Sequence, residues 1–395
     1  MRVNLFDKCR KNDRAEEAHA RGLLPYFHAI SQTDHGTEVT MEGRRVLMIG
    51  SNNYLGLTHH PRVQEAALKA IRDYGTGCSG SRFLNGTLDL HHNLEAALAA
   101  FFGTEAALVF STGFQTNLGV LSVIAGKNDL IFCDRENHAS IFDGARLSYA
   151  SLKKYRHNDL DELERLLADA PADKGKLIVS DGVFSMVGDM VDLPRLRDLA
   201  DKYGAALCID DAHGIGVIGE GGRGTASHFG VDVELLTGTF SKSFGSLGGF
   251  VAGSREVVDF VKYTARSMMF SAAMTPSNAA AALAALEVMQ SEPVHIERLR
   301  GNVEYMRDGL RRLGVDVHGH PTAIIPIVIG RDMETFATWR RLFDEGVFVN
   351  AVVAPAVPQG MGMLRTSYMA THTREQLDRC LATFSRILAE LHLVR

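Results

Sequence analysis

Short apolar runs without alternation mark the middle of the chain. They fall at residues 106–110, 130–134, 176–181, 205–211, 233–240 and 248–253, and helical stretches such as 161–170 and 192–204 separate several of them. Strands that are buried on both faces form such continuous runs, and helices between them connect parallel strands. The pattern therefore predicts a mainly parallel sheet with helices on both faces.

A polar arm, a hairpin and two amphipathic helices precede this sheet. Residues 1–22 are typical of a polar helix, and residues 38–51 of a hairpin that turns at Glu42 and Gly43. Pro61 opens a helix that Gly75 closes, and another helix covers residues 89–102. The apolar spacing predicts two inward faces, formed by Val63, Ala67, Ile71 and Tyr74 and by Leu90, Leu94, Leu98 and Phe101.

The pattern changes again after residue 275. Two long helices, at 275–293 and 295–314, lead into a strand at 323–330, a helix at 333–345, strands at 347–353 and 363–369, and a last helix from Thr373. This order is typical of a smaller α+β domain. We therefore expect an α/β chain with an N-terminal arm and hairpin (1–50), a large sheet domain (51–275) and a small C-terminal domain (276–395).

Composition narrows the class of protein. Of 395 residues, 42 are Lys or Arg and 47 are Asp or Glu, so the net charge is −5, which argues against nucleic-acid binding by bulk electrostatics. No apolar run approaches the roughly 18 residues of a membrane span, and the start lacks a secretory signal. The five cysteines are scattered, which favours a reducing compartment and a cytoplasmic location.

A glycine motif at Gly75–Thr76–Gly77–Cys78–Ser79–Gly80 matches the dinucleotide fingerprint only superficially. That fingerprint follows a strand and opens a helix, whereas this motif follows a helix. We expect instead a loop whose backbone lies close to another surface.

Three other segments sit after predicted strands and carry candidate chemistry. Residues 111–117 (STGFQTN) open a helix whose free N–H groups can bind phosphate, although a plain N-cap by Ser111 or Thr112 explains the same residues. Asp210 and His213 lie where α/β sheets bind ligands. A turn or, less readily, a metal site is the alternative for these two residues.

The third segment surrounds Lys242 with hydroxyl groups and glycines between two apolar strands. Burial would lower the pKa of its amine and make it nucleophilic, and electrostatic phosphate binding is the simpler alternative. Together the three segments suit pyridoxal 5'-phosphate (PLP). The helix N-terminus would bind its phosphate, and Asp210 would pair with its pyridinium nitrogen. The amine of Lys242 would form a Schiff base with its aldehyde.

Longer segments carry a family resemblance. They are SNNYLGLTHHP (51–61), GTGCSGSRFLNGT (75–87), STGFQTN (111–117), ENHASIFDGARLS (136–148), VSDGVFSMVGD (179–189), IDDAHGIGVIGEGGRG (209–224), GTFSKSFGSLGGF (238–250) and LRTSYMATHT (364–373). In these segments, and from about residue 24 onward, the chain resembles the α-oxoamine synthase family. This resemblance implies the fold of the fold-type I PLP transferases.

The resemblance also implies a role for each matching residue. The residues expected at the reacting centre are Lys242, which would bind PLP, Asp210, which would pair with its ring nitrogen, and His138, which would stack over its ring. The remaining contacts to PLP would come from Gly113, Phe114, Ser185, His213, Thr239 and Ser241, and from Ser271 toward the partner subunit of a homodimer. Asn53 and Arg365 would bind the carboxylate of the substrate.

Family members condense an amino acid with an acyl thioester and release CO2. Residues 81–95 and 349–358 most resemble the soluble bacterial members that join L-serine to palmitoyl-CoA and yield 3-ketosphinganine, the first step of sphingolipid synthesis. Val353 takes the place of an arginine found in some of them. The alternatives are a glycine- or alanine-using member (2-amino-3-ketobutyrate CoA ligase or 8-amino-7-oxononanoate synthase) and a silent partner subunit, which typically lacks the lysine.

The expected partners are L-serine, an acyl-CoA and a second copy of the chain, without nucleic acid. The apolar segments 268–270 and 352–363 should flank the mouth of the site, and the acyl chain could bring weak peripheral membrane contact. No metal is expected, because the adjacent pairs His59–His60 and His91–His92 cannot each face one site from one helix.

Overall fold

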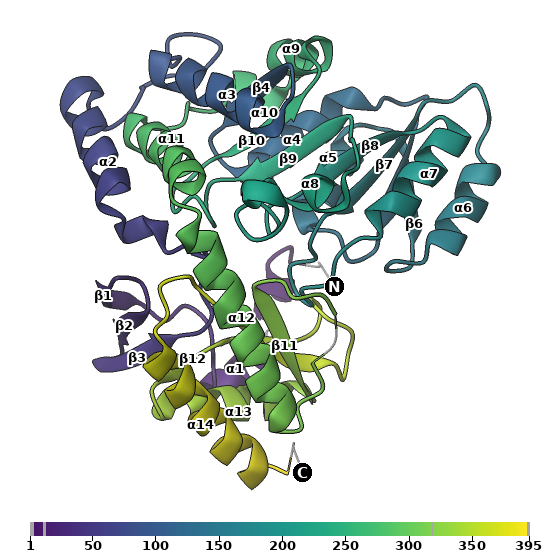
Figure 1. Ribbon diagram of the computed structural model, residues 1–395. Coiled ribbons are helices and arrows are strands. Elements are labelled where there is room, and N and C mark those ends of the chain that lie inside the picture. The colour runs from purple at the N-terminus through teal and green to yellow at the C-terminus, as the bar shows by residue number, and fades with distance from the viewer. Residues whose placement is uncertain (1–3, 11–12, 318, 393–395) are drawn as a thin grey trace.

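A seven-stranded sheet forms the centre of the larger of two lobes in the computed structural model, which describes residues 4–10, 13–317 and 319–392 (Figure 1). Its order is β4-β10-β9-β8-β7-β5-β6, in which β10 runs antiparallel to both neighbours and the other pairs are parallel. The strands are β4 (Ala106–Phe110), β5 (Leu130–Asp134), β6 (Ser151–Tyr155), β7 (Lys176–Asp181), β8 (Ala206–Asp210), β9 (Leu235–Thr239) and β10 (Gly249–Gly253). The predicted mainly parallel α/β sheet is confirmed.

Helices cover both faces of this sheet, as Figure 1 shows. On one face lie α4 (Gly113–Ile124), α5 (Ala139–Leu147), α9 (Arg255–Thr264) and α10 (Arg266–Met269). On the other lie α6 (Leu160–Ala168) and α7 (Leu193–Tyr203) at one end, and α3 (Asp89–Phe102), α2 (Pro61–Tyr74) and α11 (Pro276–Ser291) toward the other. Because both faces are covered, the inner strands are buried along almost their whole length.

The edge strand β6 was not predicted from the sequence. Its residues, SLKKY, are mostly exposed, because its side chains are only partly covered, whereas β4 at the other edge of the sheet is buried throughout. Such a polar edge lacks the continuous apolar run by which the inner strands were recognised.

The smaller lobe is built from N-terminal and C-terminal segments of the chain. Strands β1 (Ile30–Asp34), β2 (Glu38–Met41) and β3 (Arg44–Met48) form one sheet with β12 (Val347–Phe348), and β11 (Ile324–Gly330), β14 (Gly362–Ser367) and β13 (Asn350–Val352) form another. The helices α12 (Val294–Arg312), α13 (Asp332–Asp344) and α14 (Arg374–Glu390) belong to this lobe (Figure 1). The predicted domain boundaries stay a prediction. The chain passes from the larger lobe to the smaller one where α11 is followed by α12 (Figure 1).

Short helices complete the fold. They are η1 (Asp7–Arg10), α1 (Asp13–Ala20), η2 (Leu57–His59), η3 (Glu220–Gly222) and α8 (Thr225–Phe229). Within the described ranges, no helix has the length and apolar character that crossing a membrane requires.

Two details of the predicted elements are wrong. The buried face of α2 is centred on Val63 and Ala70, while Ile71 and Tyr74 are exposed, because α2 packs closely against the alanine-rich α11 through small side chains. Residues 347–353 form not one strand but two, β12 and β13, which belong to different sheets. The predicted hairpin turn is confirmed, since Glu42 and Gly43 both adopt positive φ (49° and 72°).

The glycine-rich loop at 75–88 packs against residues 272–274, as expected of a close backbone approach. The Ala273 amide donates to the Gly80 carbonyl at 2.8 Å, and a Cβ on Gly86 would lie 2.3 Å from that same oxygen. Arg82 anchors the loop through a buried, two-pronged ion pair with Glu95 of α3, at 2.8 and 3.1 Å. Glu95 also accepts from the Val109 amide of β4 at 3.0 Å, so it joins loop, helix and sheet.

Replacing Glu95 with alanine should lower the free energy of unfolding by about 3–5 kcal/mol, because it leaves the buried Arg82 without its counter-charge. The measurement is urea denaturation followed by circular dichroism. The control is Asp73→Ala, which removes the partner of the exposed Lys69 and should leave the unfolding midpoint nearly unchanged. Equal effects of the two substitutions would contradict the assigned role of Glu95.

Candidate active site

A cavity of about 250 Å³ opens at the carboxyl ends of β7, β8 and β9, beside the N-terminus of α4. Each of these three strands ends in a polar residue that lines the cavity, namely Asp181, Asp210 and Thr239. The structure brings together nine of the residues predicted from the sequence, which are Gly113, Phe114, His138, Ser185, Asp210, His213, Thr239, Ser241 and Lys242.

The first turn of α4 provides unpaired backbone donors. Thr112 caps the helix by accepting from the Gln115 amide at 3.1 Å, which leaves the amides of Gly113 and Phe114 at the cavity wall. A Cβ on Gly113 would lie 2.9 Å from the Thr239 side chain, so only glycine fits here. The Thr239 and Ser241 hydroxyl groups, 2.9 Å apart, complete a set of donors suited to a phosphate.

Asp210 is oriented by Asn117, a residue that the sequence reasoning did not single out. Asn117 Nδ2 donates to Asp210 Oδ2 at 2.6 Å and to the Ser140 hydroxyl at 2.9 Å, while Thr237 donates to Asn117 Oδ1 at 3.1 Å. The other Asp210 oxygen accepts from the Ala212 amide at 3.1 Å. The sequence did contain a signal for Asn117, because this residue is the last of the STGFQTN motif and lies one turn into α4.

Lys242 shares the cavity with two carboxyl groups. Burial lowers the pKa of its amine to about 8, although Asp210 and Asp181 pull that pKa upward. Burial, reinforced by the charge of Asp210, raises the pKa of Asp181 well above its usual range, and Asp181 Oδ1 is buried without a hydrogen-bond partner. Asp181 was missed, although it ends a parallel strand in the same way as Asp210.

Histidines flank these charges on two sides. The Nδ1 atom of His213 forms a hydrogen bond with the Tyr54 hydroxyl at 2.6 Å. Burial lowers the pKa of the His213 imidazole well below its usual range. His138 caps α5, and its Nδ1 lies 2.7 Å from the Ser140 hydroxyl. The His138 ring meets Phe114 edge to face, and burial lowers the pKa of His138 also.

Arg365 of β14 lies beside this cavity, on the side of the smaller lobe, but does not line the cavity itself. It is buried, and it donates through Nε to the Ser185 carbonyl at 2.5 Å and through Nη2 to Asn52 Oδ1 at 3.1 Å. Asn53, the residue predicted beside Arg365, points elsewhere and donates to the Thr58 hydroxyl at 2.8 Å. Adjacent asparagines look alike in the sequence, and the structure shows that Asn52 is the one that contacts Arg365, while the substrate role of Asn53 stays a prediction.

Ser271 lies outside the cavity of its own chain. Its hydroxyl accepts from Gln115 Nε2 at 3.1 Å, on the outer side of the first turn of α4. A role toward the phosphate site of a partner subunit stays a prediction.

The donor set fits PLP. Helix amides and hydroxyl groups gather at one end of the cavity for a phosphate, Asp210 provides an acceptor for a protonated ring nitrogen, and Lys242 offers an amine for the aldehyde. The chemistry of each group matches one functional group of the cofactor.

Comparison with known proteins supports this reading. The profile of the aminotransferase class I and II family matches residues 44–384. A serine palmitoyltransferase from Sphingobacterium spiritivorum is 52% identical over 380 residues, which are 96% of this chain and 95% of that protein. An 8-amino-7-oxononanoate synthase from Geobacter sulfurreducens is 46% identical over 383 residues, which are 96% of this chain and 98% of that protein.

A solved structure agrees with both the fold and the cofactor. The serine palmitoyltransferase from S. paucimobilis with a bound PLP–myriocin aldimine matches with a TM-score of 0.96 at 32% identity, covering 99% of this chain and 100% of that chain. The cavity, its donor set and these similarities lead to one assignment. The chain belongs to the aminotransferase class I and II family, and within it to the PLP-dependent α-oxoamine synthases.

Proposed function

We propose that this chain is a serine palmitoyltransferase, an acyltransferase that condenses L-serine with palmitoyl-CoA. The products would be 3-ketosphinganine, CoA and CO2, in the first step of sphingolipid synthesis. The observation that carries the proposal is 52% identity to a serine palmitoyltransferase over 95% of that protein's length, against 46% to an 8-amino-7-oxononanoate synthase. Lys242 and its complete surroundings argue against a silent subunit.

PLP, when bound, supplies an electron sink for the negative charge that develops at the substrate Cα. Gly113, Phe114, Thr239 and Ser241 would hold its phosphate, and Asp210 would keep its ring nitrogen protonated. The bonds from Asn117 and the Ala212 amide fix both Asp210 oxygens, so the carboxylate needs no reorganisation during the reaction.

Lys242 would transfer the Cα proton, and His138 would orient the substrate. With a pKa of about 8, the Lys242 amine loses its proton close to neutral pH and can accept the proton of serine Cα. Serine Cα then attacks the thioester carbonyl, and CoA leaves as the thiolate, which takes up a proton from solvent. After the bond to the carboxylate breaks and CO2 departs, Lys242 returns a proton to Cα. His138, in the same cavity, would orient the serine carboxylate.

Arg365 is the proposed partner of the serine carboxylate. Its planar guanidinium is suited to two parallel hydrogen bonds with a carboxylate. Asn52 holds one Nη of this guanidinium, and its Oδ1 also accepts from the Tyr54 hydroxyl at 3.2 Å, so we assign Asn52 as a positioning residue in place of Asn53. The loop that contains Val353 connects β13 to β14, the strand of Arg365, and would close over the acyl donor.

A homodimer is the proposed assembly. Large apolar side chains are exposed near Ser271, among them Phe83, Leu84, Phe260, Tyr263 and Phe270. A second copy of the chain would cover them and bring Ser271 to the partner's phosphate site. We also propose a cytoplasmic location, with peripheral membrane contact limited to the acyl chain.

The proposed donor preference is testable with acyl-CoAs of increasing length. Each buried methylene contributes about 0.8 kcal/mol, so kcat/KM should rise with chain length up to about palmitoyl. The assay incubates the PLP-loaded protein with L-serine, glycine or L-alanine and measures product mass. Equal turnover of acetyl-CoA and palmitoyl-CoA, or a product that contains alanine, would assign the chain to another member of the family.

The Asp210→Asn substitution should retain PLP poorly and slow Cα deprotonation by about 10²-fold or more, since the ring nitrogen loses its charged partner. Deuterium exchange at serine Cα without acyl-CoA reports this step directly. An exchange rate near wild type would remove Asp210 from the role.

Asn52→Ala should raise KM for serine about tenfold or more, because Arg365 loses a hydrogen bond that positions it. Asn53→Ala is the matched control, and it should leave this KM close to wild type, since Asn53 bonds to Thr58 instead. Steady-state kinetics with serine varied at saturating palmitoyl-CoA separates the two residues. The reverse order of effects would restore Asn53 as the substrate residue.

A further inference from the structure

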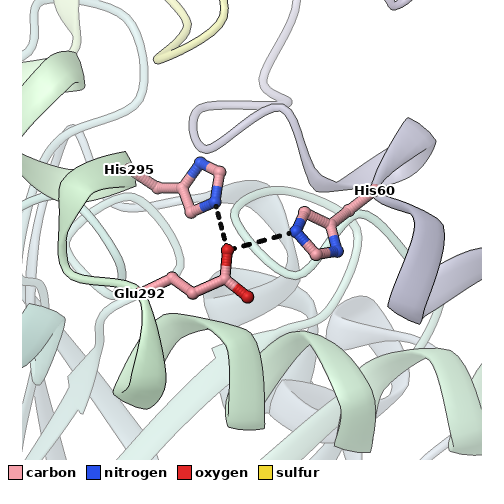
Figure 2. A group of neighbouring side chains, drawn as sticks. All are labelled: His60, Glu292 and His295. Carbon is pink, nitrogen blue, oxygen red and sulfur yellow. Dashed lines mark hydrogen bonds and ion pairs between the residues drawn. The ribbon is translucent and has the colours of Figure 1, made fainter.

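Two histidines and a glutamate converge where the chain passes from the larger lobe to the smaller one (Figure 2). His60 is the N-cap residue of α2, Glu292 is the C-cap residue of α11, and His295 lies in the first turn of α12. Within 4–10, 13–317 and 319–392, this is the one group of three or more His, Cys, Asp or Glu residues whose ligand atoms all lie within 4.8 Å of one another. The cluster is separate from the cavity described above.

The three side chains lie close enough together to bind one metal ion, because their ligand atoms are all within 4.8 Å of one another. Both histidines direct Nε2 at the same oxygen, Glu292 Oε2, at 3.4 Å from His60 and 3.3 Å from His295. Both contacts are hydrogen bonds, but they are longer than the roughly 2.7–2.9 Å of a short charge-assisted one. Their lengths match the edge of a tetrahedron, about 3.3 Å, whose centre lies about 2.0–2.1 Å from each ligand, as in zinc sites.

The ring planes support this arrangement. The two imidazole rings are inclined by 79°, with centroids 5.6 Å apart, so they meet edge to face and do not stack. Their Nε2 atoms therefore approach the carboxylate from different directions, as Figure 2 shows. The exposed fractions of the side chains are 16% for His60, 34% for Glu292 and 14% for His295, which leaves access for a fourth ligand from water.

Neighbouring residues fix the carboxylate. Arg62 Nη1 donates to Glu292 Oε1 at 3.0 Å and to the Ser291 hydroxyl at 3.1 Å, which leaves Oε2 directed at the histidines. Outer hydrogen bonds of this kind orient the ligands of many metal sites. Glu287 lies 3.7 Å from Arg62 and offsets part of its positive charge.

We propose that His60, Glu292 and His295 bind Zn²⁺ or a similar transition-metal dication, with water as the fourth ligand. Imidazole and carboxylate together suit these metals, whereas Ca²⁺ and Mg²⁺ prefer oxygen ligands alone. The metal would join the start of α2 to the α11–α12 junction and so stabilise the crossing between the lobes. Neighbouring histidines such as His59 and His60 give no indication of this site in the sequence, because the partners of His60 lie more than 230 positions away.

The experiment is calorimetric titration of the PLP-loaded protein with Zn²⁺, after removal of bound divalent metals by a chelator and buffer exchange. Wild type should bind one Zn²⁺ per chain, with a rise in Tm, and a large excess of Mg²⁺ should not compete. His60→Ala and His295→Ala should each weaken binding by about tenfold or more. His59→Ala is the matched control, since His59 bonds to Thr58 instead, and should bind as wild type does.

Circular dichroism confirms that each variant is folded, and Glu292→Gln keeps the shape of the third ligand while removing its charge. Glu292→Gln should weaken Zn²⁺ binding in the same way as the histidine variants. The proposal is overturned if the folded wild type shows no saturable Zn²⁺ binding. It is equally overturned if the His60→Ala/His295→Ala double variant binds Zn²⁺ with wild-type affinity, which would place the metal elsewhere.

Discussion

The desolvation of Lys242 beside two carboxyl groups is the constraint on which the rest of the site depends. A buried amine tends to lose its charge, and a buried carboxyl group to gain a proton, unless each has a partner. The structure places the Asp210 carboxylate close to Lys242, at the end of the strand next to the one that ends in Asp181, whose raised pKa favours the neutral carboxyl group. The result is an amine with a pKa of about 8, which is suited to covalent binding and to proton transfer.

In the proposed function, the larger lobe binds the cofactor and the smaller lobe contributes the contact to the substrate carboxylate. The large sheet and the first turn of α4 supply the groups suited to PLP, whereas Arg365 comes from the three-stranded sheet of the smaller lobe. Since Arg365 donates to the Ser185 carbonyl and to Asn52, its guanidinium is held by segments of the chain more than 100 residues away. The relative position of the lobes therefore sets the distance between the carboxylate site and Lys242, which gives the α11–α12 junction its importance.

Local signals in the sequence were sufficient for six of the seven strands of the large sheet and for most of the cavity. Asp210 and Lys242 could be recognised because each follows an apolar strand, and the carboxyl ends of parallel strands meet at one edge. Asn52 could not be told from Asn53, since the direction of each side chain depends on a turn and on contact with Arg365. The exposed edge strand β6 and the alanine contact between α2 and α11 likewise depend on neighbours distant in the sequence.

Covalent labelling of the PLP-loaded protein tests the central claim most directly. Borohydride reduction fixes PLP to the amine that holds it, and peptide mapping by mass spectrometry then identifies the residue. The account predicts a single pyridoxyl group on Lys242, in the peptide that contains residues 238–250, and its loss in Lys242→Ala. A label on any other lysine, or an undiminished label in Lys242→Ala, would contradict it.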